Sequence, residues 1–163
     1  MDLDKLTRIF LALVLLSIPL AIALEIKGEK KRLTLRQLNF KQLVDMRKCQ
    51  GCDFFKLDLK KSDLSETDLT GANLSMANLT GAYLGGANLS KAYLFKADLS
   101  TADLHQADLT GADLNEANLS TADLSGTNLS ETDLTRANLS GTNLEKANLT
   151  EADLTGVIQS PTL

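Results

Sequence analysis

A leucine stands at every fifth position along most of this chain. The series runs unbroken from Leu59 to Leu154, and Phe54 occupies the same phase one step earlier. Two positions before each of these centres lies a small residue, usually Ala, with Leu57 and Val157 as bulky exceptions. The residue in between is Asp or Asn in nearly every unit, and a polar pair follows each centre. The chain is therefore built from one unit used repeatedly.

A period of five matches neither a continuous helix nor a continuous strand. Helices repeat their apolar face at three and four residues, and strands at two. Three extended residues do place the first and third side chains on one side, and the polar pair suits a turn. Four such sides could close a coil of twenty residues with Leu and Ala inside and coils about 4.8 Å apart.

The unit itself resembles the pentapeptide-repeat family, as Ala72-Asn73-Leu74-Ser75-Met76 and Ala107-Asp108-Leu109-Thr110-Gly111 illustrate. The resemblance implies an all-β fold, the right-handed quadrilateral β-helix. Neither the square section nor its hand follows from the period alone. The centres from Phe54 to Leu154 correspond to just over five coils. The repeat domain is expected at 49–158, followed by a short tail at 159–163.

The N-terminal segment has a different character. Ile9 to Leu24 carries no charge, and Ala21-Ile22-Ala23 has the small-x-small pattern of a signal-peptidase site. Residues 1–23 are therefore expected to be a cleaved signal peptide. The alternative is a retained membrane anchor, because the basic residues between Lys27 and Arg32 hinder translocation. Together with a resemblance to lumenal and periplasmic family members, this predicts a protein exported to the periplasm or thylakoid lumen, or anchored to a membrane.

Both ends of a solenoid need covering. Residues 24–48 are predicted to form a basic linker and a cap, with a short amphipathic helix at Phe40–Lys48 plugging the first coil. The C-terminal end has no comparable cap. We expect its last coil either to pair end to end with a second copy or to be covered by the tail.

Charge is distributed unevenly. Residues 1–48 carry ten basic and five acidic residues, and residues 49–163 carry seven and sixteen, so balances of +5 and −9 give the net −4. A domain at −9 should repel a nucleic-acid backbone, and no nucleic-acid partner is expected.

No catalytic, cofactor or metal site is predicted, because each polar residue type recurs in repeating surroundings. Cys49 and Cys52 lack a thioredoxin-like context and further zinc ligands, which favours a structural role. A local disulfide between them is plausible after export. His105 is expected to be a solvated surface residue.

One face stands out when residues twenty apart are stacked. Phe55 and Phe95 share an outward column, Met76 lies at the same corner and Tyr93 beside Phe95, and a run of aspartates in register follows. Like charges in register repel, so the run suits a cation or a basic partner, although a solvated acidic face is the plainer interpretation. The apolar group suits docking, although single surface apolars are common. The candidate partner-binding face comprises Phe55, Met76, Tyr93, Phe95, Asp113, Asp133 and Asp153.

These observations favour a non-catalytic interaction scaffold, exported or membrane-tethered, with an unknown protein partner. A membrane contact through the N-terminal segment is expected if that segment is not cleaved. One alternative is an acidic DNA mimic that binds a DNA-handling enzyme such as gyrase, as the resemblance to quinolone-resistance members suggests. Another is a purely structural spacer.

Overall fold

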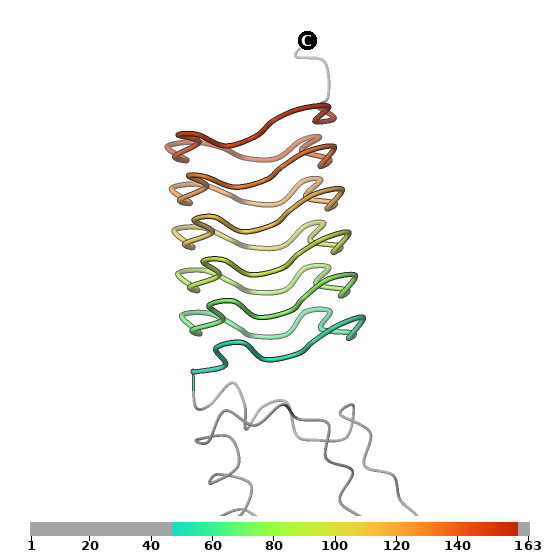
Figure 1. Cartoon of the computed structure of the whole chain (residues 1–163), viewed down its shortest axis with the longest axis vertical. Coiled ribbons are helices and arrows are strands. Elements are labelled where there is room, and N and C mark those ends of the chain that lie inside the picture. Colours follow the sequence, from blue (N-terminus) through green and yellow to red (C-terminus); the bar gives the residue numbers. More distant parts are fainter. Residues whose placement is uncertain (1–46, 160–163) are drawn as a thin grey trace, which may run out of the picture. The chain divides into compact units, whose positions relative to one another are not determined.

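The computed structural model describes residues 47–159, which belong to the second of two compact units, Met1–Leu33 and Thr34–Leu163. These residues wind into a stack of four-sided coils (Figure 1). Isolated parallel β-bridges join each side to the next coil, always between residues twenty apart, from Lys48↔Asp68 to Asn138↔Ile158. Each side contributes a single bridge residue, and the described residues contain no helix. The register is that expected for coils of four five-residue sides.

A β-turn forms each corner. The N–H of Ala112 donates to the carbonyl of Leu109 at 2.9 Å, and the same bond recurs along the chain. The second turn residue has a positive φ, as type II turns require, both at Gly111 (φ 65) and at non-glycine positions such as Thr101 (φ 57). An L-residue in this region costs about 1 kcal/mol or more, so other contacts must hold the turn.

The N–H of the positive-φ residue donates to the next coil, as Lys96 does to Asn115 at 3.0 Å, and in most units a second contact comes from the Asp or Asn. Its Oδ1 accepts the backbone N–H of the residue two positions later, at 2.8 Å from Thr135 to Asp133 and 3.2 Å from Ser120 to Asn118. Such Asx contacts stabilise turns. The polar middle position of the unit therefore serves the fold before any other purpose.

Leucine and alanine fill the interior. Leu69 and Leu134, near opposite ends of the stack, are 0% exposed, as is every centre between them. Each fully buried leucine contributes roughly 1.5–3 kcal/mol. Where threonine replaces the inward alanine, its hydroxyl finds a carbonyl: Thr127 donates to Leu104 at 2.7 Å and Thr132 to Leu129 at 2.6 Å. The buried hydroxyls of Thr127 and Thr132 are thus satisfied by backbone acceptors.

The two ends differ from the middle. Lys48, the last residue of the expected capping helix Phe40–Lys48, instead forms a β-bridge with Asp68, so the solenoid register begins before Cys49. Arg47 has a positive φ (48) and is not helical either. Residues 40–46 of that helix, the signal or anchor and the linker lie outside the described residues. At the other end Leu154 and Ile158 are exposed, and the tail beyond residue 159 is also outside the described residues. Pairing of this end with a second copy remains a prediction.

Within residues 47–159, no helix is long and apolar enough to cross a lipid bilayer.

Candidate functional site

The predicted face lies on one side of the stack and its following corner. Consecutive bridges join Asp53, Asn73, Tyr93, Asp113, Asp133 and Asp153 into one column. Phe55, Met76 and Phe95 occupy the turns that follow three of these residues. We call this column with its corner the Tyr93 face. The structure thus brings the seven candidate residues to one side of the solenoid.

The apolar residues of this face differ in how exposed they are. Tyr93 is 56% exposed, Phe55 49% and Met76 43%. Phe95 was expected to point outward like Phe55, but it is half-buried and so less exposed than Phe55. Coils lie on both sides of Phe95, whereas Phe55 belongs to the first coil described. Each ring has a lysine ammonium 5.0 Å from its centroid, Lys56 over Phe55 and Lys96 over Phe95. The rings are therefore flanked by positive charge.

An ion ladder continues the same corner, and sequence reasoning missed it. Glu116 lies 3.2 Å from the ammonium of Lys96 and 3.7 Å from the guanidinium of Arg136. The spacing of twenty residues between these three positions is the signal that could have revealed it. Exposed pairs of this kind contribute little stability each. Their effect here is to hold long side chains along the edge of the Tyr93 face.

The three aspartates of the face are in register, but no amide donor joins them. Elsewhere an Asn donates to the Asp one coil earlier, as Asn143 does to Asp123 at 3.0 Å. On the Tyr93 face, Asp113, Asp133 and Asp153 each accept a backbone N–H of their own turn, such as that of Thr155 to Asp153 at 2.9 Å, whereas Asp53 also accepts the amide of Asn73 at 3.0 Å. The hydroxyl and then the N–H of Thr155 hold the pKa of Asp153 below its usual value. This end of the face therefore stays anionic.

Metal binding gains no support from this run. Among residues 47–159, no group of three His, Cys, Asp or Glu side chains could hold a metal ion.

The opposite face carries a second exposed aromatic residue that the candidate set omitted. Tyr83 is 53% exposed and bridges to Asp63 and Asp103. It has no apolar companions comparable to Phe55 or Met76 among the exposed large side chains described. Tyr83 therefore provides a matched comparison for Tyr93.

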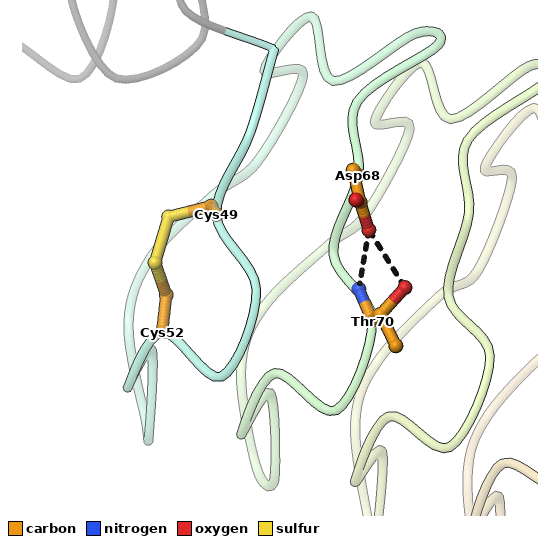
Figure 2. The surroundings of a disulfide bond; sticks show 4 residues. All are labelled: Cys49, Cys52, Asp68 and Thr70. Carbon is orange, nitrogen blue, oxygen red and sulfur yellow. Dashed lines mark hydrogen bonds between the residues drawn. A yellow bond between two sulfur atoms is a disulfide. The ribbon is translucent and has the colours of Figure 1, made fainter. Parts of the chain in front are cut away.

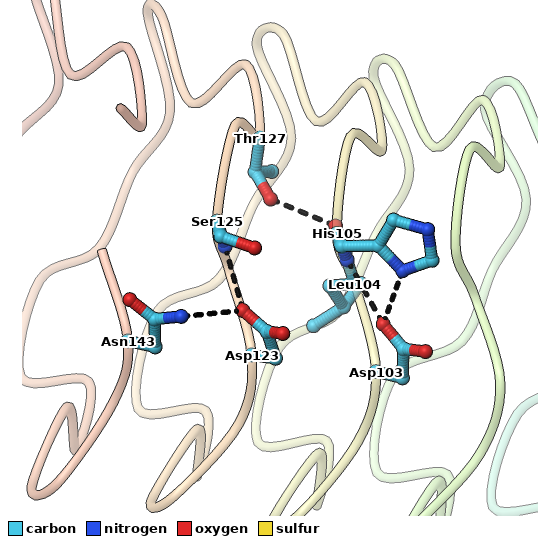
Figure 3. Close-up of polar contacts among 7 residues, drawn as sticks. All are labelled: Asp103, Leu104, His105, Asp123, Ser125, Thr127 and Asn143. Carbon is cyan, nitrogen blue, oxygen red and sulfur yellow. Dashed lines mark hydrogen bonds and ion pairs between the residues drawn. The ribbon is translucent and has the colours of Figure 1, made fainter. Parts of the chain in front are cut away.

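His105, expected to be simply solvated, has a defined partner. Its Nδ1 lies 2.6 Å from Oδ1 of Asp103 (Figure 3). The hydrogen bond and charge of Asp103 raise the pKa of His105, with a smaller contribution from Asp123. The ring also covers Gly85, where an added Cβ would collide with the imidazole. Because glycine has no side chain, Gly85 leaves room for the imidazole of His105.

The cysteines close the first described turn. Cys49 and Cys52 form a disulfide with a Cα–Cα distance of 5.3 Å (Figure 2). Cys49 occupies a centre position and Cys52 an inward small position, and the N–H of Cys52 donates to the carbonyl of Cys49 at 3.2 Å. The bond therefore crosslinks a corner of the solenoid.

Comparison with known proteins identifies one architecture. The family model described as pentapeptide repeats matches residues 48–86, 87–126 and 117–156. A pentapeptide repeat protein of the cyanobacterium Cyanothece 51142 is 30% identical, over 75% of this chain and 97% of that one, with a TM-score of 0.36. HetL of Nostoc sp. strain PCC 7120, involved in heterocyst differentiation regulation, is 34% identical over 69% and 70%, also at 0.36. A pentapeptide repeat protein of the Arabidopsis thaliana thylakoid lumen is 35% identical over 61% and 63%, at 0.30. No curated protein matches the chain.

Proposed function

Because the chain belongs to the pentapeptide-repeat family, whose members form right-handed quadrilateral β-helices, we propose that it is a non-catalytic scaffold that binds a protein partner through its Tyr93 face. The observation that carries the proposal is the gathering of exposed Tyr93, Phe55 and Met76 on one side and its following corner, while the centre leucines from Leu69 to Leu134 are buried. Aromatic and methionine side chains are enriched in the cores of protein interfaces.

The chemistry of the face describes the partner. Tyr93 lies next to Asp113 in the column, and Asp133 and Asp153 extend it. A partner that places apolar side chains against Tyr93 and Met76 and basic side chains against the aspartates would match this order. Charge complementarity of this kind mainly sets orientation and association rate.

We propose that the scaffold is exported or membrane-tethered. The proposal rests on the uncharged run Ile9–Leu24 and the small-x-small pattern at Ala21-Ile22-Ala23. The disulfide between Cys49 and Cys52 supports it, because such bonds persist mainly in oxidising compartments. Cell fractionation with N-terminal sequencing of the mature chain tests the location. A reduced, uncleaved protein in the cytoplasm would contradict it and favour the gyrase-directed DNA mimic.

Tyr93→Ser tests the face against a matched control, Tyr83→Ser. Both tyrosines occupy the same position of the unit and are similarly exposed, on opposite faces. We expect Tyr93→Ser to weaken the partner complex at least about tenfold, as loss of an interface aromatic does, and Tyr83→Ser to leave it unchanged. The measurement is the amount of complex recovered by size-exclusion chromatography of native extracts. Equal recovery of the two variants would contradict the assignment, provided that both unfold like the parent.

A further inference from the structure

The basic residues of the solenoid are concentrated in its first coil. Residues 47–66 contain Arg47, Lys48, Lys56, Lys60 and Lys61, all of them exposed. Residues 67–159 contain only four basic residues against twelve acidic ones, a balance of −8. One end of the solenoid is therefore mildly cationic while the rest is strongly anionic.

Three of these lysines flank a single side of the coil. Lys56 lies at the corner before Leu57-Asp58-Leu59, and Lys60 and Lys61 lie at the corner after it. Within the described residues none of the three ammonium groups pairs with a carboxylate, whereas Arg47 is paired with Glu66 at 2.7 Å. The Asp58 carboxylate between the two corners accepts the backbone N–H of Lys60 at 3.3 Å. These three positive charges are thus available to a partner.

An exposed ring accompanies them. Phe55 precedes Lys56, whose ammonium lies 5.0 Å from the ring centroid. The next coil offers uncharged residues at the same two corners: Ser75, Met76, Thr80 and Gly81. We call the group Phe55, Lys56, Lys60 and Lys61 the lysine edge. It combines flexible cations with an aromatic ring, a combination typical of side chains at a membrane interface.

We propose that the lysine edge binds the headgroups of an anionic lipid surface. The distribution of charge favours a lipid surface over an extended polyanion such as a nucleic acid. A nucleic acid lying along the solenoid would meet the acidic coils, whereas a membrane that touches only the first coil avoids them. The first coil also directly follows residues 1–46, which include the uncharged run Ile9–Leu24. Whether that run is cleaved or retained, the chain is delivered to a membrane with this coil nearest to it in sequence.

The proposal rests on the export or membrane tethering proposed above, and it shares Phe55 with the Tyr93 face. Tyr93 and the three aspartates take no part in it, so the lysine variants test it separately from Tyr93→Ser. A lysine close to an anionic surface strengthens binding about fivefold, so three lysines together contribute about a hundredfold. This contribution should weaken as salt screens the surface.

Vesicle binding of the full chain provides the test. The lysine-edge variant Lys56→Gln/Lys60→Gln/Lys61→Gln is compared with Lys91→Gln/Lys96→Gln/Lys146→Gln, which removes the same charge from later coils. Flotation with phosphatidylcholine vesicles, with and without about one third phosphatidylglycerol, measures the partition coefficient. Every chain keeps its N-terminal segment, so that segment cancels in the comparison.

The lysine-edge variant should lose up to about a hundredfold in partition onto the anionic vesicles, and the control should change less than about twofold. On phosphatidylcholine alone all three chains should partition equally. Equal losses in the two variants would overturn the proposal, since net charge and not the edge would then decide binding. Unchanged binding of the lysine-edge variant would overturn it as well. Failure of this test would leave the Tyr93→Ser result unaffected.

Discussion

Asp63 accepts the backbone N–H of Ser65 through its carboxylate at 3.1 Å, and equivalent contacts recur along the solenoid. The abundance of Asp and Asn is therefore explained by turn formation and by ladders such as Asn143 to Asp123. Residues that replace Asp or Asn at the middle position of the unit cannot make this turn contact. At Tyr93 and Tyr83 an exposed aromatic ring replaces the turn-stabilising acceptor. At the scale of single residues, information about function is found where the repeat is broken.

His105 offers a clean measurement, because it is the single histidine of the chain. Asp103 raises its pKa above the ordinary value near 6.5, so the imidazolium is favoured in the folded state. Its contribution to stability is complete below the unfolded-state pKa and is lost as pH rises through the folded-state pKa. NMR titration of the imidazole should show the raised pKa, and Asp103→Asn should lower it.

Asp63→Asn, on the same face but without contact to the ring, is the control and should leave the titration unchanged. An ordinary pKa for His105 in the parent protein would contradict the contact with Asp103.

The five-residue unit is the element of this fold, and the sequence predicted much of it. The period defined the sides and the inward positions of Leu and Ala, and the family resemblance supplied the four-sided coil with its twenty-residue register. It did not predict positive φ at residues such as Met76 and Thr101, because those side chains prefer other conformations and the backbone hydrogen bonds to the next coil override that preference. Nor did it predict the half-burial of Phe95, which depends on the coils on both sides. Of the predicted capping helix, Arg47 and Lys48 belong instead to the solenoid register, since Asp68 pairs with both.

Adjacent positions of one unit test the inside and the outside separately. Ala107 is 1% exposed in the narrow interior, and its neighbour Gln106 is exposed at a turn position already in the positive-φ region. Ala107→Leu should destabilise the solenoid by about 3 kcal/mol or more through overpacking. Gln106→Leu should change stability by about 0.5 kcal/mol or less. The measurement is the shift in the urea midpoint, and similar shifts for the two variants would refute the assignment of inward positions.

The whole solenoid is polarised both around its axis and along it. Around the axis, exposed apolar side chains gather on the Tyr93 face, while the opposite face carries Tyr83 and the His105–Asp103 pair. Along the axis, the lysine edge lies in the first coil and the aspartates Asp113, Asp133 and Asp153 lie in later ones. A membrane would contact the first coil, whereas a protein partner would contact Tyr93 and the aspartates of later coils, with Phe55 at the boundary between the two. Because every coil is built on the same interior, the outer surface can differ from one side or coil to another.

The central claim is that the protein partner contacts a single face of this solenoid. Positions 83, 88, 93 and 98 are the middle residues of four successive sides and so sample the four faces of one coil. A photo-crosslinking amino acid placed at each position, in the full chain and in its native membranes, tests the claim directly. We expect a discrete adduct from position 93 that exceeds those from positions 83 and 88 by about tenfold, as a single-face contact requires. Equal adducts from all four positions, or a dominant adduct from position 83, would contradict it.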